Sequence, residues 1–293
     1  FPQGKPPCSG LAELPCDTWV SFVWFSLNTE VEPLEDYLGD LVGHFEPYHF
    51  ERMAMTRWVT AEWNCNWKAG VDAFAEAYHT ATTHPQLLWY QEDLDVQIDL
   101  YDKHSRYLIP FGLLSPRVEP VGEIPPPLKS LLSDAGMDPA SYEGPVNGIR
   151  EAVQQHKRAT QEEQGKDFSE LHDDQLTDDY NYLVFPNVTT NMHSDDLMLF
   201  RHRPHPSDPN KCLFDIWMFE LIPDGEEWPE LPKHDFRPEG SQRSLGMVID
   251  QDASNLPNVQ AGMNSVAYPG LWLSDQELRL RHFHKTISDF IQK

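Results

Sequence analysis

The sequence is poor in basic residues. Its 293 residues include 22 Lys and Arg against 47 Asp and Glu, so the formal net charge is −25. Binding to nucleic acids and to anionic membranes depends on Lys and Arg that meet phosphate groups. The charge therefore argues against both kinds of partner and predicts a soluble protein with an acidic surface.

Cysteines and long apolar runs are also scarce. The four cysteines are too few for a disulfide framework, and no pair has the C-x-x-C spacing of a zinc or redox motif. Residues 1–10 lack the basic and apolar segments of a signal peptide. No apolar run approaches the roughly 20 residues needed to span a bilayer. These absences predict a reduced protein located in the cytoplasm.

Hydrophobic residues still make up 40% of the chain, enough for a sizeable core in one large domain or two modest ones. Runs rich in aromatic and β-branched residues, some of them alternating with polar residues, predict strands, and the turn at 206–210 predicts a hairpin. We expect these strands at 18–28, 50–64, 94–100, 180–193, 196–205 and 212–223. Residues 146–165 predict a helix, whereas the Pro- and Gly-rich residues 115–145 should be irregular.

The C-terminal segment predicts a long amphipathic helix. Ser274 and Glu277 form an S-x-x-E capping box, and the apolar residues after it fall on one side of a helix. Long antiparallel strands followed by one long helix predict an α+β fold. In this fold a curved antiparallel sheet wraps the C-terminal helix, a helix-grip arrangement, and additional helices accompany it.

One short segment carries the main chemical signal. Apolar residues at helical spacing predict a helix over 66–79 with His79 near its end, and His84 follows after a short turn. Both imidazoles can then converge on one point. Two neutral imidazoles and a carboxylate form the facial triad that suits non-haem Fe(II), because three coordination positions stay open. On spacing alone, two histidines making ordinary hydrogen bonds remain the alternative.

The residues around this pair extend the pattern over most of the chain. The stretch Asn66-Trp-Lys-(x)₃-Asp72-Ala-Phe-(x)-Glu76-Ala-Tyr-His79-(x)₄-His84-Pro resembles the iron-binding signature of Rieske non-haem iron oxygenases, the ring hydroxylases and their choline- and carnitine-demethylating relatives. Three further segments are similar to parts of the same family. They are the strand that ends its Rieske domain (18–25), its substrate-pocket strand (183–187) and the late segment that supplies its third iron ligand (250–262).

The resemblance implies a role for each matching residue. His79, His84 and Asp252 would be the iron ligands, with Asp250 as the rival carboxylate. Glu76 would not bind iron but would bridge His79 to the iron–sulfur cluster of a neighbouring subunit, and so carry electrons. Asp72 matches a position where some relatives have a polar residue near the iron, although a helix-surface charge is an equal alternative.

Other residues receive weaker assignments. Phe185 and Asn187, on the segment that resembles the substrate-pocket strand, are expected in the substrate pocket, and Trp217 is expected there or in the core. His282 and His284 lie two residues apart on the C-terminal helix and therefore cannot share a metal. His202 and His205 flank a hairpin and are expected to face solvent.

The family's cluster motif is absent. A Rieske [2Fe-2S] cluster needs C-x-H and C-x-x-H pairs, and this sequence has neither. We therefore interpret residues 1–30 as the C-terminal tail of a Rieske domain and residues 31–293 as the mononuclear-iron catalytic domain. The chain could bind iron but should not turn over alone.

The resemblance implies an oxygenase that activates O₂ at Fe(II) and hydroxylates an apolar, aromatic substrate. Its electrons would come from NADH through a reductase, with or without a ferredoxin. The family also implies a homotrimer, with or without a small β subunit. Two alternatives stay open, namely a metal-free module of the same fold that binds hydrophobic ligands and a zinc hydrolase that uses His79, His84 and Asp252.

Overall fold

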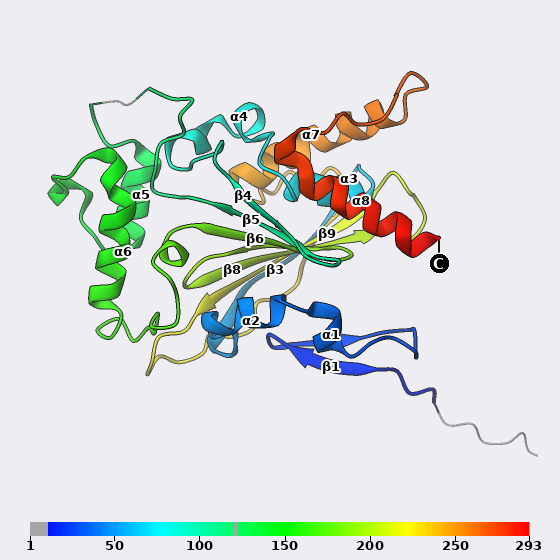
Figure 1. Cartoon of the computed structure of the whole chain (residues 1–293), viewed down its shortest axis with the longest axis horizontal. Helices are drawn as coiled ribbons and strands as arrows, with labels where there is room; N and C mark the ends of the chain where they lie inside the picture. Colours follow the sequence, from blue (N-terminus) through cyan, green and yellow to red (C-terminus); the bar gives the residue numbers. More distant parts are fainter. Residues whose placement is uncertain (1–10, 120–121, 293) are drawn as a thin grey trace, which may run out of the picture.

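The computed structural model describes residues 11–119 and 122–292, and its centre is an eight-stranded sheet (Figure 1). The strands lie in the order β10-β3-β9-β8-β7-β6-β5-β4, and every pair is antiparallel except β10 with β3. Their bounds are β3 (Met53–Trp63), β4 (Gln97–Leu100), β5 (Ser105–Ile109), β6 (Asp179–Val184), β7 (Val188–Met192), β8 (Asp196–Pro204), β9 (Cys212–Leu221) and β10 (Asp235–Arg237). The predicted α+β fold with a large antiparallel sheet is confirmed.

Helices cover both faces of this sheet. The short helices α1 and α2 and a separate hairpin lie against one face, whereas α3, α7 and α8 lie against the other (Figure 1). The hairpin consists of β1 (Cys16–Trp19) and β2 (Phe22–Phe25). The helices are α1 (Leu34–Leu38), α2 (Leu41–Phe45), α3 (Trp67–Phe74), α4 (Thr80–Thr83), α5 (Pro126–Asp134), α6 (Ile149–Thr160), α7 (Met247–Met263) and α8 (Leu278–Ile291). None of these helices is both long and apolar enough to cross a membrane.

The pleat of the strands separates two kinds of side chain. In β6, Tyr180 and Tyr182 join an apolar cluster with Phe45 of α2, whereas Asp179 and Asn181 face the opposite side. Successive side chains of a strand point to opposite faces, so one strand serves both faces. The two faces are called the packing face, on the side of α1 and α2, and the cavity face, on the side of α3 and α7.

The C-terminal helix is anchored on the cavity face as the sequence predicts. The capping box of Ser274 and Glu277 is formed in the turn that precedes α8. Phe283 is fully buried and packs with Leu183 of β6. Arg279, also fully buried, donates hydrogen bonds to Ser105 Oγ of β5 at 3.0 Å and to Asn181 Oδ1 of β6 at 2.9 Å. These bonds fix the helix across two neighbouring strands.

Several predicted elements differ from the structure. Residues 18–28, expected as one buried strand, contain the β1–β2 hairpin, which turns at Val20 and Ser21 with positive φ angles. Residues 180–193 likewise form two strands, β6 and β7. The region 115–145 contains α5, whose Leu128 is completely buried. The first ten residues of the predicted Rieske tail lie outside the described residues.

His202 corrects another expectation, because it is completely buried rather than facing solvent. Its Nε2 lies 3.0 Å from Thr189 Oγ1 of β7. Helix α3 crosses directly above the ring, and a Cβ on Gly70 would lie only 2.9 Å from His202 Nδ1. The absence of a side chain at this position lets α3 approach the sheet closely, which positions the segment that follows it.

Candidate metal centre

Two histidines and one aspartate converge at one end of the cavity face. His84 Nε2 lies 3.1 Å from His79 Nε2 and 3.0 Å from Asp252 Oδ1, and His79 Nε2 lies 3.6 Å from the same oxygen. Ligands about 2.1 Å from a divalent ion at right angles are about 3.0 Å apart, so these spacings fit adjacent positions around one ion. Among the described residues, this is the one group of three such side chains whose donor atoms lie within 4.8 Å of one another.

The hydrogen bonds on the far side of each ring fix where its proton lies. Nδ1 of His79 is 2.5 Å from Glu76 Oε1, and Nδ1 of His84 is 2.8 Å from Gln251 Oε1. Gln251 Oε1 also accepts from Gln86 Nε2 at 2.7 Å, which orients the amide. Both partners accept, so each Nδ1 carries the proton and each Nε2 of a neutral ring presents a lone pair.

Three acceptor atoms therefore face one point, and none of them has a proton to donate to the others. Such an arrangement is unfavourable unless a cation occupies the point or one of the rings becomes protonated. Burial works to lower the pKa of His79, but the hydrogen bond and charge of Glu76, together with Asp252, raise it overall. A divalent metal would satisfy all three lone pairs at once, so the donor set fits a mononuclear metal with open positions.

The local sequence explains why these side chains meet. Asn66 caps α3, since its side chain accepts from the backbone N–H of Lys68 at 3.0 Å. The helix ends at Phe74, earlier than the predicted 79, and His79 instead precedes α4 while His84 ends it. Helix α7, which was not predicted, supplies Asp252, and its Gln260 accepts from the Asn66 backbone N–H at 2.7 Å. This bond ties the third ligand to the start of α3.

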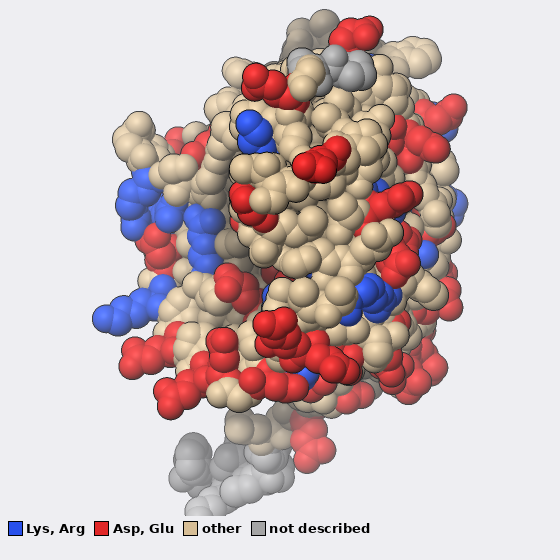
Figure 2. Space-filling view, turned by 90° about the vertical axis from the view of Figure 1, so that its left-hand side faces the viewer, with Lys and Arg blue, Asp and Glu red and all other residues tan. Residues whose placement is uncertain are grey.

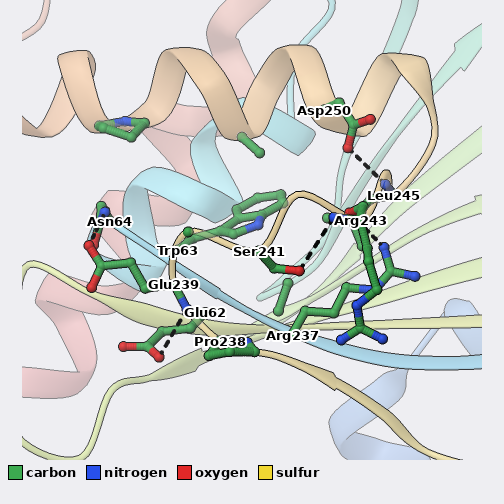
Figure 3. A pocket seen from close by; sticks show the side chains of 14 residues that line it. Glu62, Trp63, Asn64, Arg237, Pro238, Glu239, Ser241, Arg243, Leu245 and Asp250 are labelled. Carbon is green, nitrogen blue, oxygen red and sulfur yellow. Dashed lines mark hydrogen bonds between the residues drawn. The ribbon is translucent and has the colours of Figure 1, made fainter.

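Asp250 points away from the centre. Its carboxylate accepts from the backbone N–H of Leu245 at 2.8 Å, at the start of α7 (Figure 3). It also accepts from Ser244 Oγ at 2.5 Å. It lines a different pocket, together with Arg237 and Arg243. Two residues along a helix turn a side chain by roughly 200°, so only one of the two aspartates can face the histidines. The geometry favours Asp252.

The two acidic residues before His79 have different partners. Glu76 is buried, and its other oxygen accepts from the backbone N–H of His79 at 3.1 Å. Asp72 lies 2.8 and 3.0 Å from His284 Nε2 of α8, a pairing that the sequence did not predict. Burial raises the pKa of Asp72, although the bond with His284 opposes the shift. Asp72 thus contacts α8 rather than the metal ligands.

A cavity of about 420 Å³ opens beside the metal centre. Its walls combine apolar side chains, such as Ile109 and Phe200, with polar ones from β6 and β7. Phe185, Asn187 and Trp217 are absent from its lining. Phe185 packs with Phe283 of α8, whereas the other two line a hollow beside the β1–β2 hairpin. The sequence did contain a signal for part of this lining: in β6, Asp and Asn alternate with Tyr in a strand that is otherwise apolar.

The surface agrees with the acidic composition. Asp and Glu side chains are spread widely over the face that Figure 2 shows, and they outnumber Lys and Arg. Some acids are neutralised locally, as in the buried Asp215, which is bound by Arg201 and Arg203. No Lys or Arg of the described residues forms an ion pair with Asp252, which instead faces His79 and His84.

Comparisons with known proteins identify a family for most of the chain. Residues 50–293 match the family described as the ring hydroxylating alpha subunit (catalytic domain). A segment of 79 residues is 29% identical to the glycine betaine monooxygenase oxygenase subunit of Pseudomonas aeruginosa, covering 27% of this chain and 18% of that protein.

Solved structures share the fold at low sequence identity. A quaternary ammonium Rieske monooxygenase matches with a TM-score of 0.60 at 13% identity, covering 94% of this chain and 62% of that one. Naphthalene 1,2-dioxygenase with indole in its active site matches with a TM-score of 0.57 at 15% identity, covering 95% and 64%. The chain thus spans a little over three fifths of the solved chains that it resembles.

Proposed function

The chain belongs to the family of ring-hydroxylating α-subunit catalytic domains, and from this premise we propose that it is the oxygenase part of an enzyme that uses one ferrous ion to insert oxygen from O₂ into an organic substrate. One observation carries this proposal. The Nε2 atoms of His79 and His84 and Oδ1 of Asp252 lie 3.0–3.6 Å from one another around one point. Iron bound by this set would supply the activation of O₂.

The chain's own residues perform the supporting tasks. Glu76 and Gln251 hold the Nδ1 protons of the two imidazoles, which keeps both Nε2 lone pairs directed at the ion. The apolar part of the cavity, which includes Phe200 and Met218, excludes water and holds the body of an apolar, aromatic substrate beside the metal. His79, His84 and Asp252 all line this cavity, so a substrate in it would lie beside the residues that would hold the iron.

Electron supply would involve Glu76 as a bridge. Its carboxylate already bonds His79, and we propose that it also meets a cluster-binding histidine of a neighbouring subunit in a head-to-tail trimer. The electrons would come from NADH through a reductase, with or without a ferredoxin. In the full-length protein, Glu76→Ala should keep its iron but lose NADH-coupled turnover. Unimpaired turnover would contradict the bridging role.

Anaerobic reconstitution with Fe(II), followed by metal analysis, tests the proposal. The full-length protein should retain about one equivalent of iron after desalting and, with reductase, NADH and ¹⁸O₂, should place labelled oxygen in an aromatic probe such as naphthalene or indole. No retained metal would favour the metal-free binding module. Retained zinc with hydrolase activity would favour the zinc hydrolase, and either result would contradict the oxygenase.

A further inference from the structure

The cavity beside the metal centre has one distinctly polar wall. It is formed by Asp179 and Asn181 of β6, by Asn191 of β7 and by His193, which directly follows β7. Asn181 and Asn191 face each other across the two strands. Most of the remaining lining is apolar. Polar side chains also line the metal-centre end of the cavity, and Arg57, Thr80 and Gln91 line it as well. A substrate in this cavity would therefore meet mostly apolar side chains, with this wall as a separate group of polar atoms.

Asp179 is the unusual member of this wall. It is 2% exposed, and Asn191 Nδ2 donates to its Oδ2 at 2.6 Å. Its other oxygen, Oδ1, has no hydrogen-bond partner among the described residues. Nε2 of His193 lies 3.9 Å from Oδ1, beyond hydrogen-bond distance. A buried carboxylate oxygen without a donor is costly, so the site favours a group that can donate to it.

The nearest guanidinium and amide donors are engaged with other acceptors. Nδ1 of His193 lies 2.9 Å from Asp196 Oδ1, on the side away from Asp179. Arg279 donates to Ser105 and Asn181, and Asn181 Nδ2 lies 3.4 Å from Asn191 Oδ1. Among the carboxylate and amide oxygens of this wall, Asp179 Oδ1 is the acceptor that lacks a hydrogen-bond partner.

Asp179 is ionised at neutral pH even though it is buried. Burial raises its pKa to about 6, still below neutrality. Burial works to lower the pKa of His193, but Asp196 and Asp179 raise it to about 9, so the ring is a cation that partly balances the two acids. The carboxylate therefore offers a charged acceptor, which makes stronger hydrogen bonds than a neutral one.

We propose that Asp179 Oδ1 accepts a hydrogen bond from the substrate, and that the substrate is an apolar molecule with one donor head group, an amine or a hydroxyl. This inference rests on the proposed function and adds a polar anchor to it. Asp179 acts as a specificity-determining residue, because a ligand without the donor would leave its carboxylate buried and unpaired. The anchored head group would fix which part of the apolar body lies toward His79, His84 and Asp252.

Binding of matched probes at pH 7.5 tests the proposal. Toluene, benzyl alcohol and protonated benzylamine share one ring and differ in their donor group. By calorimetric titration of the full-length protein, benzylamine should bind about 10–100-fold more tightly than toluene, with benzyl alcohol between them, as expected for a hydrogen bond to a charged group. Equal affinities of toluene and benzylamine in the wild-type protein would overturn the proposal, whether or not any variant folds.

Two substitutions test whether Asp179 causes the preference for benzylamine. Asp179→Asn keeps the shape but replaces the charged acceptor, so it should remove most of the preference for benzylamine while the affinity for toluene changes little. Asp178→Asn is the matched control, because Asp178 is the adjacent buried aspartate, is bound to Arg150 and does not line the cavity. It should keep the wild-type ratio. A full preference in Asp179→Asn would overturn the proposal.

The titrations are repeated on the metal-free protein, with iron content measured separately. If the protein cannot retain iron but still prefers benzylamine to toluene, the result would support the Asp179 anchor and contradict the proposed oxygenase function. Retained iron without a probe preference would contradict the anchor alone.

Discussion

The two faces of the central sheet are built from the same strands but differ in what they bury. The packing face combines apolar and aromatic side chains of β6, β8 and β9 with α2, for example Tyr182 against Phe45, with ring centroids 4.8 Å apart. The cavity face buries Asp179, His84 and Asp252. Burial of apolar side chains on the packing face thus stabilises the folded state. The cavity face instead holds buried polar groups whose hydrogen bonds the protein alone leaves incomplete.

Along these strands, residues that stabilise the packing face alternate with residues that line the cavity. Because neighbouring residues of a strand point to opposite faces, a substitution in β6 affects packing or the cavity according to its position in the alternation. In β3, a bulge between Met55 and Arg57 reverses the alternation. Met55 packs on the packing face, whereas Arg57 lines the cavity. The bulge allows one long strand to serve both faces in turn.

The largest expected effect is on the cavity face. His84→Ala removes one of three ligands, so iron binding should be lost, a greater effect than the roughly 10–100-fold loss typical when a group that only orients a ligand is removed. The stability of the metal-free protein should not fall much, because the substitution also removes one of three opposed acceptors. Iron content and thermal unfolding of the metal-free protein measure both. His205→Ala, outside the centre, is the control and should retain iron.

On the packing face, the opposite result is expected. Leu197 is 1% exposed in the apolar cluster, so Leu197→Ala should lower the free energy of unfolding by about 2–5 kcal/mol. The folded fraction should still bind one iron. Denaturant unfolding and iron content per folded protein test this pair of outcomes. Lost iron in the folded fraction would mean that the two faces are not separate.

A smaller effect concerns pH. The pKa of Asp179 is about 6 in the folded protein against 3.8 as the ordinary value, because burial favours the neutral acid. Below about pH 4, Asp179 is neutral in both the folded and the unfolded protein, and its stabilising effect on the folded state is complete. As the pH rises from about 4 to about 6, the unfolded protein loses this proton first, so the free energy of unfolding falls. The difference between these two pKa values corresponds to about 3 kcal/mol of unfolding free energy. Relative to Asp179→Asn, which stays neutral, the metal-free wild type should lose about this much stability between pH 4 and pH 7.

Denaturant unfolding of both proteins across this range measures the difference. The charged groups around Asp179 are His193, Asp196 and Arg279, and His193 should stay protonated throughout because its pKa is about 9. A pH-independent difference between the two proteins would mean that Asp179 does not titrate as a buried acid.

Much of the fold could be predicted because strands and the last helix carry strong periodic patterns. Residues 53–63, 196–204 and 212–221 form strands close to their expected positions, and the capping box before α8 forms as expected. Helix α7 was missed because Pro257 lies inside it, and proline usually ends a helix. The β1–β2 hairpin was missed because its turn at Val20 and Ser21 lacks the usual Gly or Asn.

The sequence could predict those parts of the site whose residues lie close together along the chain. His79 and His84 lie five residues apart, so a short segment brings them together. The contact between Asp72 and His284 joins residues 212 positions apart, and no local pattern predicts it. Phe185 is excluded from the cavity because it packs against Phe283 of α8, whereas Asn187 and Trp217 line the hollow beside the β1–β2 hairpin. Periodicity identifies the face of a strand but does not identify its partner across the core.

The most direct test compares two aspartates on one helix. Asp252→Ala and Asp250→Ala are reconstituted anaerobically with Fe(II), desalted and analysed for iron beside the wild-type protein. Asp252 faces His84 at 3.0 Å, whereas Asp250 bonds Leu245 and Ser244. Asp252→Ala should lose the iron, and Asp250→Ala should keep about one equivalent. Full iron in Asp252→Ala, or its loss in Asp250→Ala alone, would contradict the metal centre described above.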